Sequence, residues 1–429
     1  MDADDKSPLF NPWVQLIVGL IAMACVANLQ YGWTLFVSPI DAKYHWGRPE
    51  IQFAFSMFAL IETWLIPVET WFVDKYGPRL VVVAGGVLVA AAWVLNSMAS
   101  TLLMLYAGAI LGGVGTGCVY GTCVGNALKW FPGRRGLAAG FTAAGFGAGA
   151  AFTIVPISRM IQTSGYEQAF FFFGILQGTV VLLMAILIRK APAGLGGGVK
   201  AKASVAGRDY TPAEVLRTPC FYVMYVMFVC IAAGGLTFAA SIAPYARDMK
   251  LDGIPVSLMG ITMMALPFAL ALDRVFDGVG RPFFGFVSDR IGRENTMFIA
   301  FSLGAVALFV WSNSASTPVV FVLSSALYFG VYGEIFSLFP ATQGDTFGSK
   351  FAATNAGMLY TAKGAAALFV PAASALAGSN GWGAVFSLAI GLNIFAAALA
   401  LFVLKPMRAR HLAASRQPIV SGAVPTTVA

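Results

Sequence analysis

The sequence predicts an all-α membrane protein in which twelve transmembrane helices form two pseudo-symmetric six-helix bundles. Of its 429 residues, 58% are hydrophobic and only 11% are charged, whereas a soluble domain carries about 25% charged residues. Apolar stretches of about 18 to 25 residues recur along the chain, and each is long enough to cross a hydrocarbon core about 30 Å thick. A short polar motif also occurs once in each half of the chain, which favours a protein built from two similar halves.

The apolar runs and the polar breaks between them set the expected spans. These lie near residues 13–38, 51–72, 80–98, 102–128, 136–160, 169–188, 220–244, 260–286, 295–313, 318–341, 353–377 and 382–404. One long polar segment separates six spans from six. The expected organisation is an N-terminal bundle, a central cytoplasmic loop, a C-terminal bundle and a cytoplasmic tail, at 1–188, 189–217, 218–404 and 405–429.

Lysine and arginine are distributed unevenly between the loops. One set of loops, with the central segment and the tail, holds most of them, and the opposite set holds only Lys43, Arg48, Arg159, Arg247 and Lys250. The positive-inside rule then predicts a multi-pass plasma (inner) membrane protein with both termini in the cytoplasm. The net charge of +8 therefore follows from topology, and no nucleic-acid partner is expected.

Cysteine and histidine give no sign of a metal site. All five cysteines fall inside apolar stretches, where a thiol packs as a small apolar group, and both histidines fall in loops or tails. Neither a nucleophile–base pair nor a phosphate-binding loop is visible. We therefore expect no metal, no cofactor and no enzymatic activity.

The repeated motif follows the second predicted span of each half. The first copy contains Asp74, Gly77 and Arg79. The second copy contains Gly285, Asp289, Arg290, Gly292 and Arg293. An aspartate at a helix end, beside a tight glycine turn and cations, can lock neighbouring helices through charge-assisted hydrogen bonds. We therefore expect these two loops to act as conformational gates.

Four ionisable residues stand far from any predicted loop. Arg281 and Lys363 each lie near the middle of a predicted span, as do the acids Glu62 and Glu334. A charge at that depth is costly unless it is paired, hydrated or bound to a ligand, so it marks a functional site by default. Two cations at this depth suit a small dicarboxylate anion. Each of the acids can pair with a cation, carry a proton, or stay protonated on a backbone carbonyl.

The eighth predicted span carries Asp273, Arg274, Asp277 and Arg281 within a stripe of roughly 100°. Arg281 can clamp a carboxylate, because its planar fork matches that group with two hydrogen bonds. Alternatively, Arg281 and Asp277 form a structural pair at i,i+4 spacing. For Asp273 and Arg274 we favour the structural role.

Several short segments, in order along nearly the whole chain, resemble one transporter family. They are 30–34, 72–79, 130–132, 135–140, 143–145, 216–219, 281–285 and 362–363. Together they resemble the oxalate/formate antiporter family of the major facilitator superfamily, a neighbour of the monocarboxylate transporters. The second copy of the loop motif is complete, and the first has Thr70 where that superfamily usually has glycine.

The resemblance implies the major facilitator fold and a substrate site. It implies that Arg281 and Lys363 bind the carboxylates of oxalate or a similar anion, and that aromatic side chains wall the pocket. By position these are Tyr31, Trp33, Tyr120, Phe146, Tyr332, Phe336 and Tyr360. Asp277 stands where related sequences often have asparagine, and its spacing to Arg281 is similar to that in the proton-coupled monocarboxylate transporters.

The expected function is secondary transport of a small carboxylate by alternating access, with oxalate/formate exchange first and proton-linked monocarboxylate symport, through Asp277, as the alternative. An empty site with two unpaired cations would resist reorientation and make exchange obligatory. Asp277, Glu62 and Glu334 would relieve this if they paired with the cations. The expected partners of a monomer are the bilayer and the substrate alone.

Overall fold

The computed structural model describes residues 8–131, 135–192, 208–258, 260–313, 317–348 and 351–416. Its first half contains the 3₁₀ turn η2 (Pro8–Phe10), α1 (Pro12–Val26), α2 (Asn28–Tyr31), α3 (Thr34–Tyr44), α4 (Arg48–Trp64), α5 (Ile66–Tyr76), α6 (Pro78–Ser97), α7 (Leu102–Trp130), α8 (Arg135–Gly149), the 3₁₀ turn η3 (Ala150–Phe152), α9 (Ile154–Ser164) and α10 (Tyr166–Leu187).

The second half begins with a short helix and includes the one hairpin of the described residues. Its elements are α11 (Pro212–Leu216), α12 (Pro219–Asp248), β1 (Pro255–Leu258), β2 (Ile261–Met264), α13 (Ala265–Ile291), α14 (Arg293–Ser312), α15 (Pro318–Tyr332), α16 (Ile335–Phe347), α17 (Ala352–Ala367), α18 (Phe369–Asn380), α19 (Trp382–Ala398), the π-helical segment η4 (Leu399–Leu404) and α20 (Lys405–Arg416). The antiparallel hairpin pairs Pro255 with Met264.

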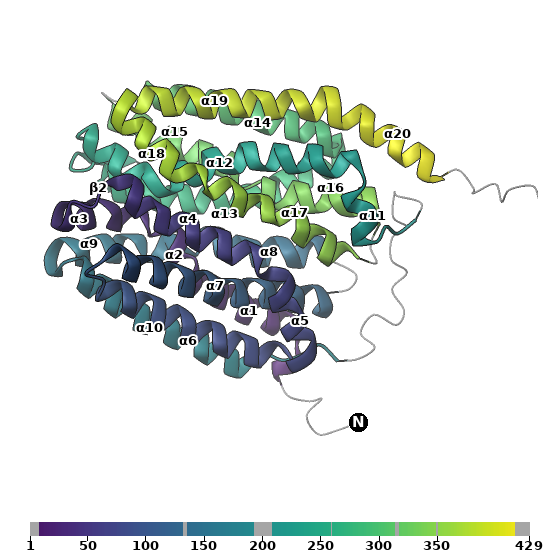
Figure 1. Ribbon diagram of the computed structural model, residues 1–429, viewed down its shortest axis with the longest axis horizontal. Coiled ribbons are helices and arrows are strands. Elements are labelled where there is room, and N and C mark those ends of the chain that lie inside the picture. Colours follow the sequence, from purple (N-terminus) through teal and green to yellow (C-terminus); the bar gives the residue numbers. More distant parts are fainter. Residues whose placement is uncertain are drawn as a thin grey trace, which may run out of the picture.

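The helices run roughly side by side in two groups (Figure 1). Helices α1 to α10 occupy the lower half of the view, and α12 to α20 occupy the upper half. The first described residues and α20 lie at the same end, which we call the termini end, and the hairpin lies at the other, which we call the opposite end. Helix α4 packs on α17 and α8 packs on α13, so these pairs join the two halves.

Ten helical stretches within the described residues are long and apolar enough to cross a membrane. The two predicted spans absent from these ten are α4–α5 and α13. A bend at Leu65 divides the first of these, and α13 carries four charges between Asp273 and Arg281. Both segments are long enough to cross a membrane, and both carry interior charges. Together with the ten, they give the twelve spans predicted from the sequence.

Local sequence explains where the helices turn. Gly77 and Gly292, in the two copies of the repeated motif, adopt φ angles of 83° and 93°. Glycine has no Cβ, so it takes this left-handed conformation without a steric penalty and ends the preceding helix. Proline stands in the first turn of the next helix at Pro78, where its missing N–H costs nothing.

Helix breaks position the interior side chains. The first span is broken into α1, α2 and α3 around Ala27 and Gly32, and the tenth breaks between α15 and α16 at Gly333. A Cβ on Gly333 would collide with the Asp277 carboxylate, so only glycine fits at this break. None of these breaks was predicted from the hydrophobic pattern.

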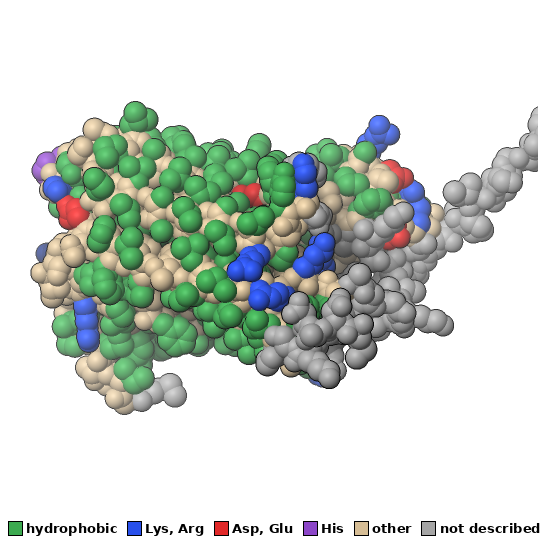
Figure 2. Space-filling view, turned by 90° about the horizontal axis from the view of Figure 1, so that it is seen from below, with side chains coloured by type: hydrophobic (Ala, Val, Ile, Leu, Met, Phe, Trp, Pro, Cys, Tyr) green, Lys and Arg blue, Asp and Glu red, His purple; other side chains and the backbone are tan. Residues whose placement is uncertain are grey.

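Many large hydrophobic side chains are exposed on the surface. In the face shown in Figure 2, hydrophobic side chains cover most of the visible area, and Lys and Arg side chains gather mainly toward the termini end. This is the arrangement of a protein surrounded by lipid.

Part of the predicted tail after residue 404 is helical. Residues 405–416 continue as the helix α20, which is rich in the good helix formers alanine and arginine. Arg408 anchors this helix, because its guanidinium lies 2.7 Å from Glu294 Oε1 on α14. The rest of the expected tail, and residues 193–207 of the expected central loop, lie outside the described residues.

Candidate functional site

A charged cluster on α13 faces the interior. Asp277 accepts hydrogen bonds from Arg281 Nη2 at 3.1 Å to each carboxylate oxygen, and from Nε at 3.3 Å. Arg274 Nη1 lies 3.5 Å from the same carboxylate. Arg281 also donates to the Ala143 carbonyl oxygen at 2.8 Å and to the Tyr31 hydroxyl at 3.3 Å. One acid therefore lies between two arginines, and Arg281 reaches across to the first half of the molecule.

Lys363 on α17 is paired with an acid from the other half of the molecule. Its Nζ lies 3.0 Å from Glu62 Oε1 and 2.8 Å from Oε2, and it donates to the Tyr360 hydroxyl at 3.4 Å. The lysine is 1% exposed and the glutamate 0%. A buried charge is tolerated only when it is paired in this way, and this pair connects α4 to α17 directly.

Two glycines allow this close approach. A Cβ on Gly147 of α8 would lie 3.0 Å from the Arg281 guanidinium, so the arginine packs directly on the α8 backbone. A Cβ on Gly364 of α17 would overlap the Thr63 hydroxyl on α4. At each of these two contacts between the halves, a glycine leaves room for the facing helix next to a cation.

Six of the seven predicted aromatic residues form one continuous chain of ring contacts around the cations. Neighbouring ring centroids are 5.4 to 5.9 Å apart along the order Tyr31, Phe146, Tyr120, Tyr360, Phe336 and Tyr332. The Arg281 Cζ lies 4.5 Å from the Phe336 centroid, and the Lys363 Nζ lies 6.0 Å from the same centroid. The two cations thus share one aromatic ring, and rings from both halves enclose them.

The seventh aromatic residue, Trp33, makes a contact toward the opposite end. Its indole N–H donates to Gln52 Oε1 at 3.1 Å, and Gln52 in turn donates to the Ala240 carbonyl at 2.8 Å. The described contacts of Trp33 therefore link the two halves and include none of the charged residues.

The other two interior acids predicted from the sequence, Asp273 and Glu334, make no hydrogen bond to Lys363 among the described residues. Asp273 accepts a hydrogen bond from Ser325 at 2.8 Å. Glu334 is fully buried at the α15–α16 break, and neither of its oxygens has a hydrogen-bond partner among the described residues. Arg274 stacks between Tyr31 and Phe329, with centroid distances of 4.1 and 4.2 Å.

Two further contacts join the halves near the site. At the opposite end, Arg48 makes two hydrogen bonds to Asp248, at 2.6 and 2.8 Å, beside a hollow of about 360 Å³. Beside the Glu62–Lys363 pair, the Trp64 indole, which is 53% exposed, donates to the Thr361 carbonyl at 3.1 Å. Because Arg281 and Lys363 are only 1% exposed, the structure is an occluded state.

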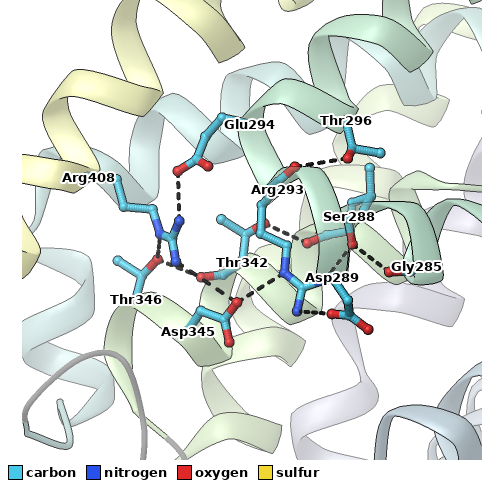
Figure 3. A network of polar contacts seen from close by, with 12 residues as sticks. Gly285, Ser288, Asp289, Arg293, Glu294, Thr296, Thr342, Asp345, Thr346 and Arg408 are labelled. Carbon is cyan, nitrogen blue, oxygen red and sulfur yellow. Dashed lines mark hydrogen bonds and ion pairs between the residues drawn. The ribbon is translucent and has the colours of Figure 1, made fainter.

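The second copy of the repeated motif forms a polar network at the termini end (Figure 3). Arg293 lies 2.7 Å from Asp289 and 3.0 Å from Asp345 on α16, and it donates to Ser288. Arg290 lies over the Phe286 ring at 4.1 Å. Gly285 contributes its carbonyl as an acceptor for Ser288. Arg293 thus ties the α13–α14 turn to α16.

The first copy is less fully described. Gly77 forms the turn between α5 and α6, and Arg79 is exposed on α6. The side chain of Asp74 lies outside the described residues.

Sequence reasoning did not identify Glu294, Asp345 and Arg408 as members of this network. Arg408 lies 2.7 Å from Glu294 and 4.0 Å from Asp345, and its Nε donates to Thr346 at 2.7 Å. Two features of the sequence could have indicated this network. Asp345 lies near the end of the tenth span and Arg408 lies just beyond the twelfth, so both border loops at the termini end.

Comparison with known proteins places the chain in a family. Residues 18–277 match the Major Facilitator Superfamily. The chain is 34% identical to an oxalate:formate antiporter of Oxalobacter formigenes, over 93% of each chain. It is 26% identical to YhjX, an uncharacterized MFS-type transporter of Escherichia coli, over 81% of this chain and 84% of that one. A shorter match, 32% identical over 30% of this chain and 25% of its relative, is to human monocarboxylate transporter 11. These matches confirm the family and the twelve-span fold predicted from the sequence, and the chain belongs to the Major Facilitator Superfamily of membrane transporters, which are not enzymes.

Proposed function

We propose that this protein exchanges small carboxylate anions, of the oxalate and formate type, across a membrane by alternating access. The observation that carries the proposal is the placement of Arg281 and Lys363, two buried cations that share the Phe336 ring. A planar guanidinium binds a carboxylate with two hydrogen bonds and an ammonium neutralises a second one. The relative named as an oxalate:formate antiporter supports the same substrate class.

In this proposal the two halves rock around the cations. The Arg48–Asp248 pair joins α4 to α12 and therefore separates when the site opens toward the opposite end, whereas the Arg293–Asp345 network lies within the second half and moves with it. The basic residues toward the termini end support an orientation with both termini in the cytoplasm, in the plasma (inner) membrane.

A second candidate, proton-coupled symport of a monocarboxylate, is favoured by one observation. Asp277 accepts hydrogen bonds from Arg281 through both oxygens, so an incoming carboxylate competes with it for the guanidinium. A proton on Asp277 would release the arginine to the substrate.

Transport by purified protein in liposomes separates the two candidates. Uptake of labelled oxalate is measured with vesicles preloaded with oxalate and with empty vesicles, and formate is added as competitor. Exchange predicts faster uptake in preloaded vesicles and competition by formate. Absence of oxalate uptake under both loadings, with lactate or pyruvate entering along an imposed proton gradient, would replace exchange by symport.

A further inference from the structure

The carboxylate of Glu62 lies where a substrate carboxylate would contact Lys363. Both of its oxygens lie within 3.0 Å of the Lys363 ammonium, which is the arrangement expected of a bound carboxylate ligand. Glu62 belongs to α4 and Lys363 to α17, so the acid reaches the cation from the opposite half of the molecule.

Resting on the exchange function proposed above, we propose that Glu62 is an internal counter-anion. It occupies Lys363 when no substrate is bound, lets the empty carrier reorient, and sets the preference between monocarboxylates and dicarboxylates. Exchange by this protein is then not obligatory.

The first consequence concerns the empty carrier. An unpaired ammonium in the interior carries a large desolvation cost, and a carrier with such a charge would be held back from reorienting until substrate arrived. Here Lys363 is paired with Glu62, and Arg281 is paired with Asp277. Each of these two cations is paired with an acid of the protein. Neither is therefore left unpaired in the interior when the empty carrier changes conformation.

The second consequence concerns the substrate. A dicarboxylate that reaches both cations must displace Glu62 from Lys363 and leave that carboxylate buried without its cation. A monocarboxylate that binds beside Arg281 leaves the Glu62–Lys363 pair intact. Glu62 therefore weakens the binding of a substrate that has a second carboxylate. Removing the Glu62 carboxylate favours oxalate over formate.

The test compares Glu62→Gln with removal of an exposed acid on the same helix. Glu50 lies in the first turn of α4 and is exposed, so Glu50→Gln removes one carboxylate charge from the helix that carries Glu62 and is the control. Wild type and both variants are reconstituted in liposomes whose proton gradient and membrane potential are clamped by ionophores. Uptake of labelled oxalate and of labelled formate is measured with empty and with oxalate-loaded vesicles.

We expect wild type to take up oxalate into empty vesicles at a measurable fraction of its exchange rate. In Glu62→Gln this fraction should fall by about tenfold or more, and the oxalate-to-formate affinity ratio should rise by a similar factor, the scale of one hydrogen bond to a charged group. Glu50→Gln should keep both wild-type ratios.

Strictly obligatory exchange by wild type would overturn the inference, as would wild-type ratios in Glu62→Gln, and the exchange function would stand in both cases. Absence of any carboxylate flux in wild type would overturn the exchange function and this inference with it. If Glu62→Gln does not fold, the wild-type measurement still decides. Glu62→Asp, which keeps the charge but shortens its reach, should then shift both ratios in the same direction by less.

Discussion

The contact between Gly147 and Arg281 gives a sharp test of the site. In a Gly147→Ala variant the new Cβ would lie 3.0 Å from the Cζ, Nε and Nη2 atoms of Arg281. The guanidinium is held on its other sides by the Ala143 carbonyl at 2.8 Å and by both Asp277 oxygens at 3.1 Å. It can retreat by a few tenths of an ångström only by lengthening these hydrogen bonds.

Overpacking of this kind typically costs about 1 to 3 kcal/mol. If that cost falls on the geometry of the anion site, carboxylate binding weakens by about 5- to 150-fold. The assay is the concentration dependence of initial oxalate exchange in preloaded liposomes.

Gly140→Ala is the matched control on the same helix, because no described atom outside its own stretch of helix lies within 4 Å of its new Cβ. Both variants exchange glycine for alanine within α8, so both gain about 1 kcal/mol of helix propensity. A Gly147→Ala protein with the same half-saturation concentration and rate as Gly140→Ala would show that Arg281 does not position the anion.

Four further substitutions test the charges. Arg281→Lys should lower exchange by about tenfold or more with the protein still folded, because a point charge does not replace hydrogen bonds worth about 1.5 to 3 kcal/mol each; wild-type flux would refute the clamp. Lys363→Gln should reduce oxalate transport more than formate transport, and equal losses would remove Lys363 from substrate discrimination. Asp277→Asn should leave exchange near the wild-type rate, since asparagine still offers Arg281 an acceptor; lost exchange would indicate a pairing or proton role. Arg48→Ala should raise alkylation of a cysteine introduced beside Asp248 by up to about fivefold, the value of an exposed ion pair, and unchanged labelling would exclude this pair from closure.

Residues that share one helix were predictable in detail. The spacing of Asp273, Arg274, Asp277 and Arg281 fixes their common face, because a helix advances 100° per residue, and the i,i+4 contact of Asp277 with Arg281 follows from that spacing. The structure contains this pair.

Contacts between helices were not predictable in the same way. Glu62 and Lys363 are 301 residues apart, and the sequence offered Glu334 as an equal alternative partner. The choice depends on how closely α4 approaches α17, which Gly364 permits. Trp33 is a second example. The helix breaks around Ala27 and Gly32 fix the direction of its side chain, and the hydrophobic pattern of the sequence does not reveal these breaks.

The two ion pairs differ in a way that assigns them different tasks. Arg281 and Asp277 belong to one helix, so their separation stays nearly constant when the halves rock, and this pair is suited to holding the anion throughout the cycle. Lys363 and Glu62 belong to different halves, so their separation depends on the position of α4 relative to α17. Occupancy of Lys363 by substrate or by Glu62 is therefore linked to conformation, because a ligand shifts a two-state equilibrium only through its differential affinity for the two states. Affinity should then respond most to changes around Arg281, and the coupling between substrate and reorientation should respond most to changes around Lys363.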